Sequence, residues 1–302
     1  MYSVLIMGGS DFVGSSLAKY LIENKHEVDI LTRGIKPINY KGIHKHIICD
    51  RKNQKAIEKN LKNKRYDYIF DMNAEDKDDV KILLQNIDCN SLNKYILLSP
   101  MEINNRTITK YQRDSIKNKK DEIEKYVKEI SNSYIIIRAS HIYGEKNKIS
   151  NESYFFHQIE ESNQIKIPKN ISIKTQLIYI DDFIKVLYSL MKSSHVRKIY
   201  NVTNPQVITF EDYINTLGEV MGIEPNIKYI EDISKIDLDL KEHFDFNMEI
   251  NYLNIDKIIQ DGIYIPNILL KKGIEYSYEW YKKRSQKKVK IKNKLEKILQ
   301  IG

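Results

Sequence analysis

The sequence predicts an α/β fold, a doubly wound parallel sheet followed by a smaller and less regular C-terminal region. Three observations predict it. Short apolar runs alternate with helical patterns through the first half, and strands buried on both faces carry such continuous apolar runs. A glycine-rich turn follows the first run, as at a strand-to-helix junction. The second half contains no Gly/Ser linker, so we expect it to pack against the sheet.

The first half supplies its elements in a regular order. Between the strand-like runs, apolar residues recur at three- and four-residue spacing, which predicts helices. Right-handed crossovers then place these helices on both faces of the sheet. The predicted strands are 3–7, 27–32, 46–49, 68–70, 95–99 and 134–138, and the predicted helices are 13–24, 78–88 and 115–130.

The second half gives fewer signals. Segment 176–191 predicts a strand that turns into a helix, with Asp181 and Asp182 as caps of the helix N-terminus. The remaining predicted elements are a strand at 198–204, a helix at 209–222 with a Thr209 cap and a Gly222 stop, and an aromatic-rich helix at 274–284.

The composition excludes several classes of protein. The 302 residues are 41% hydrophobic, enough for a packed core. No stretch approaches the roughly 18 consecutive apolar residues of a membrane span, and the chain starts on a strand-like run with no room for a signal peptide. We therefore expect a cytoplasmic protein with no membrane partner. Cys49 and Cys89 have neither disulfide nor metal-binding spacing, so we expect buried, reduced thiols and no metal site.

The net charge of +8 leaves the class of partner open. A basic protein can bind an anion such as a nucleotide, a nucleotide sugar or a nucleic acid. Much of the excess lies in the segment RSQKKVKIKNKLEK at 284–297. This segment is either a solvated tail helix or a nucleic-acid or membrane contact, and no aromatic residues interleave with its lysines.

The segment GGSDFVG at 8–14 resembles a dinucleotide-binding loop. Gly8 or Gly9 would allow the tight turn, and Gly14 would let the helix pack closely on the strands, with the pyrophosphate held at the helix N-terminus. Asp11 stands where the central glycine would be. We interpret it as a helix N-cap, which stabilises the helix by about 1 kcal/mol. The same carboxylate would repel the phosphates and weaken binding about ten- to thirtyfold; if it points away from them, most of this penalty disappears.

The end of the second predicted strand indicates which dinucleotide is bound. The segment LTRG contains Thr32 and Arg33 where an acidic residue would hold the ribose 2′-hydroxyl. An arginine suits a 2′-phosphate, so the sequence favours NADP, with NAD as the alternative. Arg33 could equally be an ordinary surface turn residue. Asp50 follows the third strand and either meets an adenine edge or belongs to a turn.

Several motifs together resemble the extended short-chain dehydrogenase/reductase family, the NAD-dependent epimerases and dehydratases. The likeness runs from about residue 2 to about residue 284 and implies a Rossmann fold. The motifs, in order, are GGSDFVG (8–14), RASHIYG (138–144), YIDDF (179–183) and YNVTN (200–204) followed by the helix from Thr209. Atypical members resemble it most, among them chloroplast stem-loop-binding proteins implicated in RNA binding.

The resemblance also exposes departures in the catalytic segment. The family uses a tyrosine as acid/base, a lysine four residues later that lowers its pKa, and a Ser or Thr that orients the substrate. Lys120 matches the lysine and Ser99 the serine, but Ile116 stands at the tyrosine position and cannot transfer a proton. The family's usual mechanism is therefore expected to be absent. Substitutes from elsewhere in the chain would be Tyr111, Glu102 or His141.

The resemblance implies a division of the chain and a set of site residues. The expected parts are a dinucleotide-binding Rossmann domain at 1–150 to which 176–204 returns, a substrate-binding part at 151–175 and 205–284, and a basic tail at 285–302. The expected catalytic residues are Lys120 and Ser99. The expected cofactor-binding residues are Gly8, Gly9, Ser10, Asp11, Phe12, Val13, Gly14, Thr32, Arg33, Asp50, Ala74, Ser99 and Lys120.

Three functions remain open from the sequence. The first is an NAD(P)-binding epimerase, dehydratase or reductase-like protein acting on a nucleotide sugar or a similar small molecule. The second is a non-catalytic relative, a cofactor-binding or scaffold protein that kept the fold and lost the tyrosine. The third is an RNA-binding protein. Relatives often pair through two helices of the first domain, which suggests a homodimer.

Overall fold

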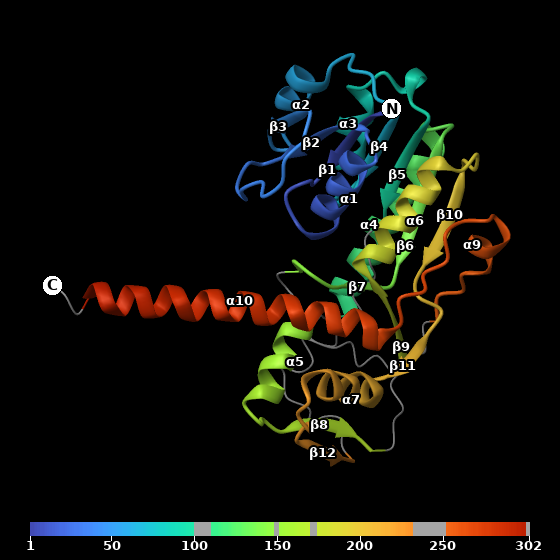
Figure 1. Cartoon of the computed structure of the whole chain (residues 1–302). Helices are drawn as coiled ribbons and strands as arrows, with labels where there is room; N and C mark the ends of the chain where they lie inside the picture. Colours follow the sequence, from blue (N-terminus) through green and yellow to red (C-terminus); the bar gives the residue numbers. More distant parts are fainter. Residues whose placement is uncertain (100–109, 148–150, 170–173, 232–251, 300–302) are drawn as a thin grey trace.

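The computed structural model describes residues 1–99, 110–147, 151–169, 174–231 and 252–299. Its centre is a seven-stranded sheet in the order β10-β6-β5-β4-β1-β2-β3, and every pairing in it is parallel (Figure 1). The strand order reverses between β1 and β4, where doubly wound sheets bind their ligands. The strands are β1 Ser3–Met7, β2 Glu27–Thr32, β3 Lys45–Ile48, β4 Tyr68–Asp71, β5 Lys94–Leu98, β6 Tyr134–Ala139 and β10 Lys198–Val202.

Both faces of this sheet are buried, as the continuous apolar runs predicted. In β1, Val4 and Ile6 belong to one apolar cluster, and Leu5 and Met7 belong to the other. Helix α1 packs against α6 in one layer, and α3 packs against α2 and α4 in the other. The helices are α1 Phe12–Glu23, α2 Gln54–Leu61, α3 Lys77–Gln85, α4 Lys110–Ile130 and α6 Ile180–Lys192.

The rest of the chain forms a smaller unit below the carboxyl ends of the strands (Figure 1). Helices α5, α7 and α10 pack on one another there, beside the sheets β11-β9-β7 and β12-β8. The elements are β7 His141–Tyr143, α5 Asn151–Glu160, β8 Ile165–Pro168, β9 Lys174–Tyr179, β11 Val207–Thr209, α7 Phe210–Met221, β12 Ile227–Ile230 and α10 Leu270–Leu299. The short helix α9 Asp256–Gln260 packs instead on β10 of the central sheet.

The ends of α7 were predicted correctly from the sequence, and the end of α10 was not. Thr209 caps α7 in a capping box with Asp212, and Gly222 ends it in the left-handed region at φ 68°, as predicted. Helix α10 is longer than the predicted 274–284 because it continues through the basic segment to Leu299. Figure 1 shows it extending beyond the rest of the fold.

Two expectations were wrong. Asp181 and Asp182 lie in the first turn of α6, whose N-cap is Tyr179, and no side chain caps it. Asp182 is instead fully buried and accepts hydrogen bonds from Tyr264 Oη at 2.7 Å and from two backbone N–H groups of the 267–268 segment. Cys89 is exposed rather than buried, because it begins the surface 3₁₀ helix η1 Cys89–Ser91.

Within the described residues, none of the helices combines the length and the apolar character that a bilayer crossing requires.

Candidate cofactor site

The loop between β1 and α1 needs glycine at three positions. Gly8 has φ +93°, a conformation that side chains rarely adopt. A Cβ at Gly9 would lie 2.5 Å from the Ile30 side chain, and a Cβ at Gly14 would lie 2.1 Å from the Gly8 carbonyl oxygen. The loop therefore brings bare backbone to the carboxyl end of β1, directly before a helix N-terminus whose first N–H groups lack intrahelical acceptors. This cradle fits a pyrophosphate.

Asp11 does not act as the predicted cap. It occupies the N-cap position with extended backbone, φ −131° and ψ 163°, but its side chain accepts no hydrogen bond from the helix. The carboxylate instead forms an ion pair with Lys36 Nζ. The interpretation of Asp11 as a side-chain cap is therefore wrong, because the carboxylate turns away from the helix N–H groups toward the segment after β2.

That segment folds back onto the glycine loop. Gly34 turns the chain at φ +75° and donates its N–H to Thr32 Oγ1 at 3.1 Å. Tyr40 Oη donates to the Gly9 carbonyl oxygen at 2.6 Å. Arg33 is exposed at the start of the segment, and it makes no hydrogen bond or ion pair with the residues that the structure describes. Its guanidinium is thus available to a ligand at this edge.

The residues after β3 and β4 enclose an arginine that sequence reasoning missed. Asp50 is exposed and accepts a hydrogen bond from Lys52 N at 2.9 Å, as in a turn, and its contact with an adenine edge stays a prediction. The next residue, Arg51, is buried and makes two hydrogen bonds to Asp71 at 2.7 and 2.8 Å, and one to Asn73 Oδ1 at 2.7 Å.

This buried network supports the floor of the cradle. The Asn73 side chain lies against Gly8, 3.2 Å from the position of a Cβ there. Ala74 follows it and is buried. A buried charge is stable only when it is paired and hydrogen-bonded. The signal in the sequence was therefore the pair of opposite charges, Arg51 two residues after the predicted strand 46–49 and Asp71 directly after the predicted strand 68–70.

The predicted catalytic serine belongs to a second cluster at the same sheet edge. Ser99 follows β5, is 4% exposed, and donates its hydroxyl to Glu124 Oε1 at 2.8 Å. Arg138 on β6 makes two hydrogen bonds to the same carboxylate, at 2.9 and 2.6 Å. Burial would raise the pKa of Glu124, but the hydrogen bonds from Arg138 and Ser99 outweigh it and lower that pKa. The Ser99 proton is thus committed to a neighbour.

The structure describes the side chains of two other predicted catalytic residues, Lys120 and His141. Lys120 lies one helical turn before Glu124 on α4, and its charge helps to lower the Glu124 pKa. His141 is half-buried in β7, and burial lowers its pKa to about 4, so its ring is neutral at neutral pH. Glu102 and the side chains of Tyr111 and Ile116 lie outside the described residues. The predicted roles of Ser99 and Lys120 stay predictions.

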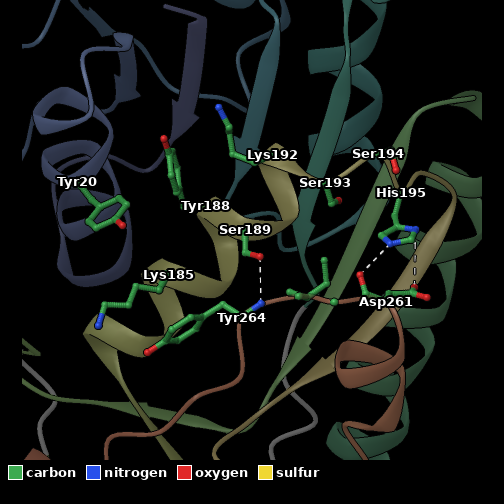
Figure 2. A pocket seen from close by; sticks show the side chains of 12 residues that line it. Tyr20, Lys185, Tyr188, Ser189, Lys192, Ser193, Ser194, His195, Asp261 and Tyr264 are labelled. Atoms are coloured by element: carbon green, nitrogen blue, oxygen red, sulfur yellow. Dashed lines mark hydrogen bonds and ion pairs between the residues drawn. The ribbon is translucent and has the colours of Figure 1, made fainter.

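An open cleft lies elsewhere, beside α6. It has a volume of about 670 Å³ and is lined by the outer face of α6, by Tyr20 of α1 and by the turn at 261–264. Figure 2 shows Tyr20 facing Tyr188, with ring centroids 5.3 Å apart. Lys185 and Lys192 project from the same helix on either side of Tyr188 (Figure 2). No sequence motif marked this cleft.

Comparisons with known proteins agree with this fold. The NAD dependent epimerase/dehydratase family matches residues 4–113. A chloroplast stem-loop binding protein of 41 kDa (b) from Arabidopsis thaliana is 23% identical over 297 residues, which cover 91% of this chain and 78% of that protein.

Solved structures resemble the chain over nearly its whole length. ADP-L-glycero-D-manno-heptose-6-epimerase from Helicobacter pylori is 20% identical with a TM-score of 0.71, covering 92% of this chain and 96% of that one. UDP-glucuronic acid 4-epimerase from Bacillus cereus, solved with UDP-glucuronic acid and NAD, is 16% identical with a TM-score of 0.69, covering 93% and 99%. At such identities the likeness concerns the fold.

Proposed function

We propose that the chain, whose residues 4–113 match the NAD dependent epimerase/dehydratase family, is an extended short-chain dehydrogenase/reductase that binds NADP across Gly8–Gly14. We further propose that it acts on a nucleotide sugar or a similar small molecule. The single observation that supports this most is the glycine cradle. Gly9 and Gly14 leave no room for a Cβ, and Gly8 has a positive φ. This glycine pattern at the carboxyl end of β1, directly before a helix N-terminus, is the one that dinucleotide-binding loops use.

The residues of the chain divide the work of binding. The N–H groups at the start of α1 face the pyrophosphate, and the helix dipole favours its negative charge. Arg33 holds the 2′-phosphate, because its planar guanidinium can make two parallel hydrogen bonds to it. Lys120 holds the nicotinamide ribose, as the resemblance implies. The bound cofactor would supply the hydride acceptor or donor.

Proton transfer is where this protein departs from its family. Ile116, at the expected tyrosine position, carries no acidic group, and the Ser99 hydroxyl donates a hydrogen bond to Glu124. A proton acceptor near the nicotinamide would have to be another group, such as His141, which is neutral at neutral pH. A cofactor-binding protein without turnover is therefore the nearest alternative, and it shares every binding step proposed above.

The test is a titration with NADPH and NADH, followed by a search for turnover. We expect NADPH to bind more tightly than NADH, and Arg33→Met to remove at least tenfold of that preference while leaving NADH affinity within twofold. Lys41→Met, an exposed lysine in the same segment, is the control. Absence of binding of either dinucleotide at millimolar concentration would disprove the proposal.

Turnover separates the enzyme from its non-catalytic alternative. The loaded protein is incubated with UDP-glucose, UDP-glucuronic acid and an ADP-heptose, and the sugar protons are followed by NMR. Epimerised or dehydrated product supports the enzyme. Cofactor binding with no change in any sugar supports the non-catalytic relative.

RNA binding is the second candidate, and the α6 cleft favours it. Half-buried tyrosine rings beside lysines are the arrangement on which unpaired bases stack while the backbone is neutralised. The Arabidopsis relative is described as a stem-loop binding protein. If the cleft binds RNA, affinity for a stem-loop should fall steeply between 50 and 200 mM salt. The variant Lys185→Gln/Lys192→Gln should weaken binding, and Lys81→Gln on α3 should not.

The basic tail gives this candidate a second test. Removing residues 285–302 leaves the cleft intact and deletes most of the basic segment. If the truncation alone abolishes RNA binding, the tail is the binding element and the cleft is not. Binding that is absent, or insensitive to salt, ends the candidate.

A further inference from the structure

The Asp11 carboxylate presents a problem that its structural surroundings solve. An aspartate in a pyrophosphate loop should repel the ligand and, as a cap, occupy an N–H group that the phosphates need. The Asp11 side chain accepts no hydrogen bond from the helix, so it does not occupy one of these N–H groups. It is directed to Lys36, and the two side chains are 39% and 43% exposed at the mouth of the loop. The helix N–H groups are left to a ligand.

Lys36 is held in place by the backbone around it. The segment that carries it is fixed on one side by the Gly34 turn onto Thr32. On the other side, Tyr40 bonds to the Gly9 carbonyl oxygen, and Gly42 packs on Ile22 of α1, where a Cβ would lie 2.6 Å from that side chain. The Lys36 ammonium group is therefore held beside Asp11 by a segment that is anchored at both ends.

We propose that Lys36 is the counter-ion that makes the Asp11 loop able to accept a pyrophosphate. This inference rests on the proposed cofactor binding and adds a positioning residue that no motif marks. The pair replaces the neutral central glycine of such loops by two opposite charges whose sum is also neutral. Lys36 acts on the pyrophosphate through Asp11, so its effect is equal for NADH and NADPH. A lysine that instead contacted the 2′-phosphate would affect NADPH alone.

A double-mutant cycle tests this directly. The four proteins are the full-length chain, Asp11→Asn, Lys36→Met and the double variant, with Lys41→Met as the matched control. Dissociation constants for NADPH and NADH are measured by fluorescence titration at low salt and at 0.5 M salt. Melting temperatures of all variants are recorded, and because the pair is largely exposed we expect them to stay within a few degrees of one another.

The expected pattern is specific. Lys36→Met leaves an uncompensated carboxylate beside the phosphates and weakens both dinucleotides about tenfold. The double variant returns to within about threefold of the unaltered protein, because neither charge remains. The loss in Lys36→Met shrinks at 0.5 M salt, where the Debye length is only about 4 Å. Lys41→Met changes nothing.

Other outcomes overturn the inference, and they are distinguishable from failure of the proposed function. If the unaltered protein binds both dinucleotides and Lys36→Met is within twofold of it, or weakens NADPH alone, the counter-ion role is wrong while the proposed function stands. If the effects of the single variants merely add, the role is also wrong. If none of the proteins binds a dinucleotide, the proposed function fails and the inference fails with it.

Discussion

The glycine loop after β1 and the Ser99 cluster after β5 lie at the same edge of one sheet, yet they hold their functional groups differently. In the loop, the proposed binding groups are the backbone N–H groups before α1, and Gly9 and Gly14 leave no room for a Cβ beside them. In the cluster, the groups are side chains, and Ser99, Glu124 and Arg138 satisfy one another. The comparison teaches that one sheet edge can present bare backbone at one strand end and a cluster of mutually hydrogen-bonded side chains at another.

Replacing Gly14 should have the largest effect. In Gly14→Ala the new Cβ would meet the Gly8 carbonyl oxygen at 2.1 Å, so α1 must move away from the strand. We expect a loss of about 3 kcal/mol or more of unfolding free energy and a loss of NADPH affinity beyond tenfold, measured by urea unfolding and titration. Gly222→Ala is the control: its φ is +68° but nothing lies within 4 Å, and it should cost about 1 kcal/mol without changing affinity. Equal effects of the two variants on stability and affinity would contradict the close contact between Gly14 and the Gly8 carbonyl oxygen.

Acid should destabilise the fold through His141. Burial lowers the pKa of His141 to about 4, against about 6.5 in the unfolded chain. Between these values the unfolded state binds more protons, so stability is present above pH 6.5 and is lost as pH falls toward 4. We expect His141 to lower the unfolding free energy by about 2 to 3 kcal/mol across this pH range. Urea unfolding at a series of pH values measures the loss. In His141→Gln the dependence should flatten. If the pH dependence of the unfolding free energy is unchanged in His141→Gln, it comes from other groups. One such group is His26, whose pKa is also lowered by burial.

Breaking the cluster tests whether it is structural. In Glu124→Gln the two hydrogen bonds from Arg138 lose their charged acceptor. The new amide N–H₂ group is a donor, and it would face the donor groups of Arg138 or Ser99. We expect a loss of about 2 kcal/mol with NADPH affinity unchanged within threefold. The control is Glu129→Gln on the same helix, which is exposed and should be neutral. A large loss of affinity in Glu124→Gln without a loss of stability would place the cluster in the binding site.

The smallest predicted effect distinguishes an aspartate that forms an ion pair, Asp11, from one that caps its helix, Asp76. Asp76 caps α3 by accepting from Asp79 N, so Asp76→Ala should cost about 1 kcal/mol. Asp11 stands at the same position of α1 without a side-chain hydrogen bond, so Asp11→Ala should cost less than about 0.5 kcal/mol. Thermal unfolding of both variants measures the difference. Equal losses would mean that Asp11 caps its helix in solution.

The sequence predicted most of the first half because local patterns determine it. The alternation of Val4, Leu5, Ile6 and Met7 between two buried clusters follows from apolar character alone. Gly14 was placed correctly because its role depends on a close approach that every strand–turn–helix loop of this kind requires.

The remaining features depend on contacts that are distant in sequence. Lys36 reaches Asp11 across 25 residues, and Asp182 binds a segment more than 80 residues away. Nothing near Asp11 in the sequence distinguishes a carboxylate that caps from one that pairs with a distant lysine. The α6 cleft is likewise assembled from α1, α6 and the 261–264 turn, and no periodicity brings these together.

The most direct test of the account is a crystal structure of the protein grown with NADP. We predict dinucleotide density across Gly8–Gly14, with the pyrophosphate at the start of α1, the 2′-phosphate at Arg33, and the Asp11 carboxylate still on Lys36 and turned away from the phosphates. A loop without density at saturating NADP, or with Asp11 bonded to the helix N–H groups in place of a phosphate, would contradict it.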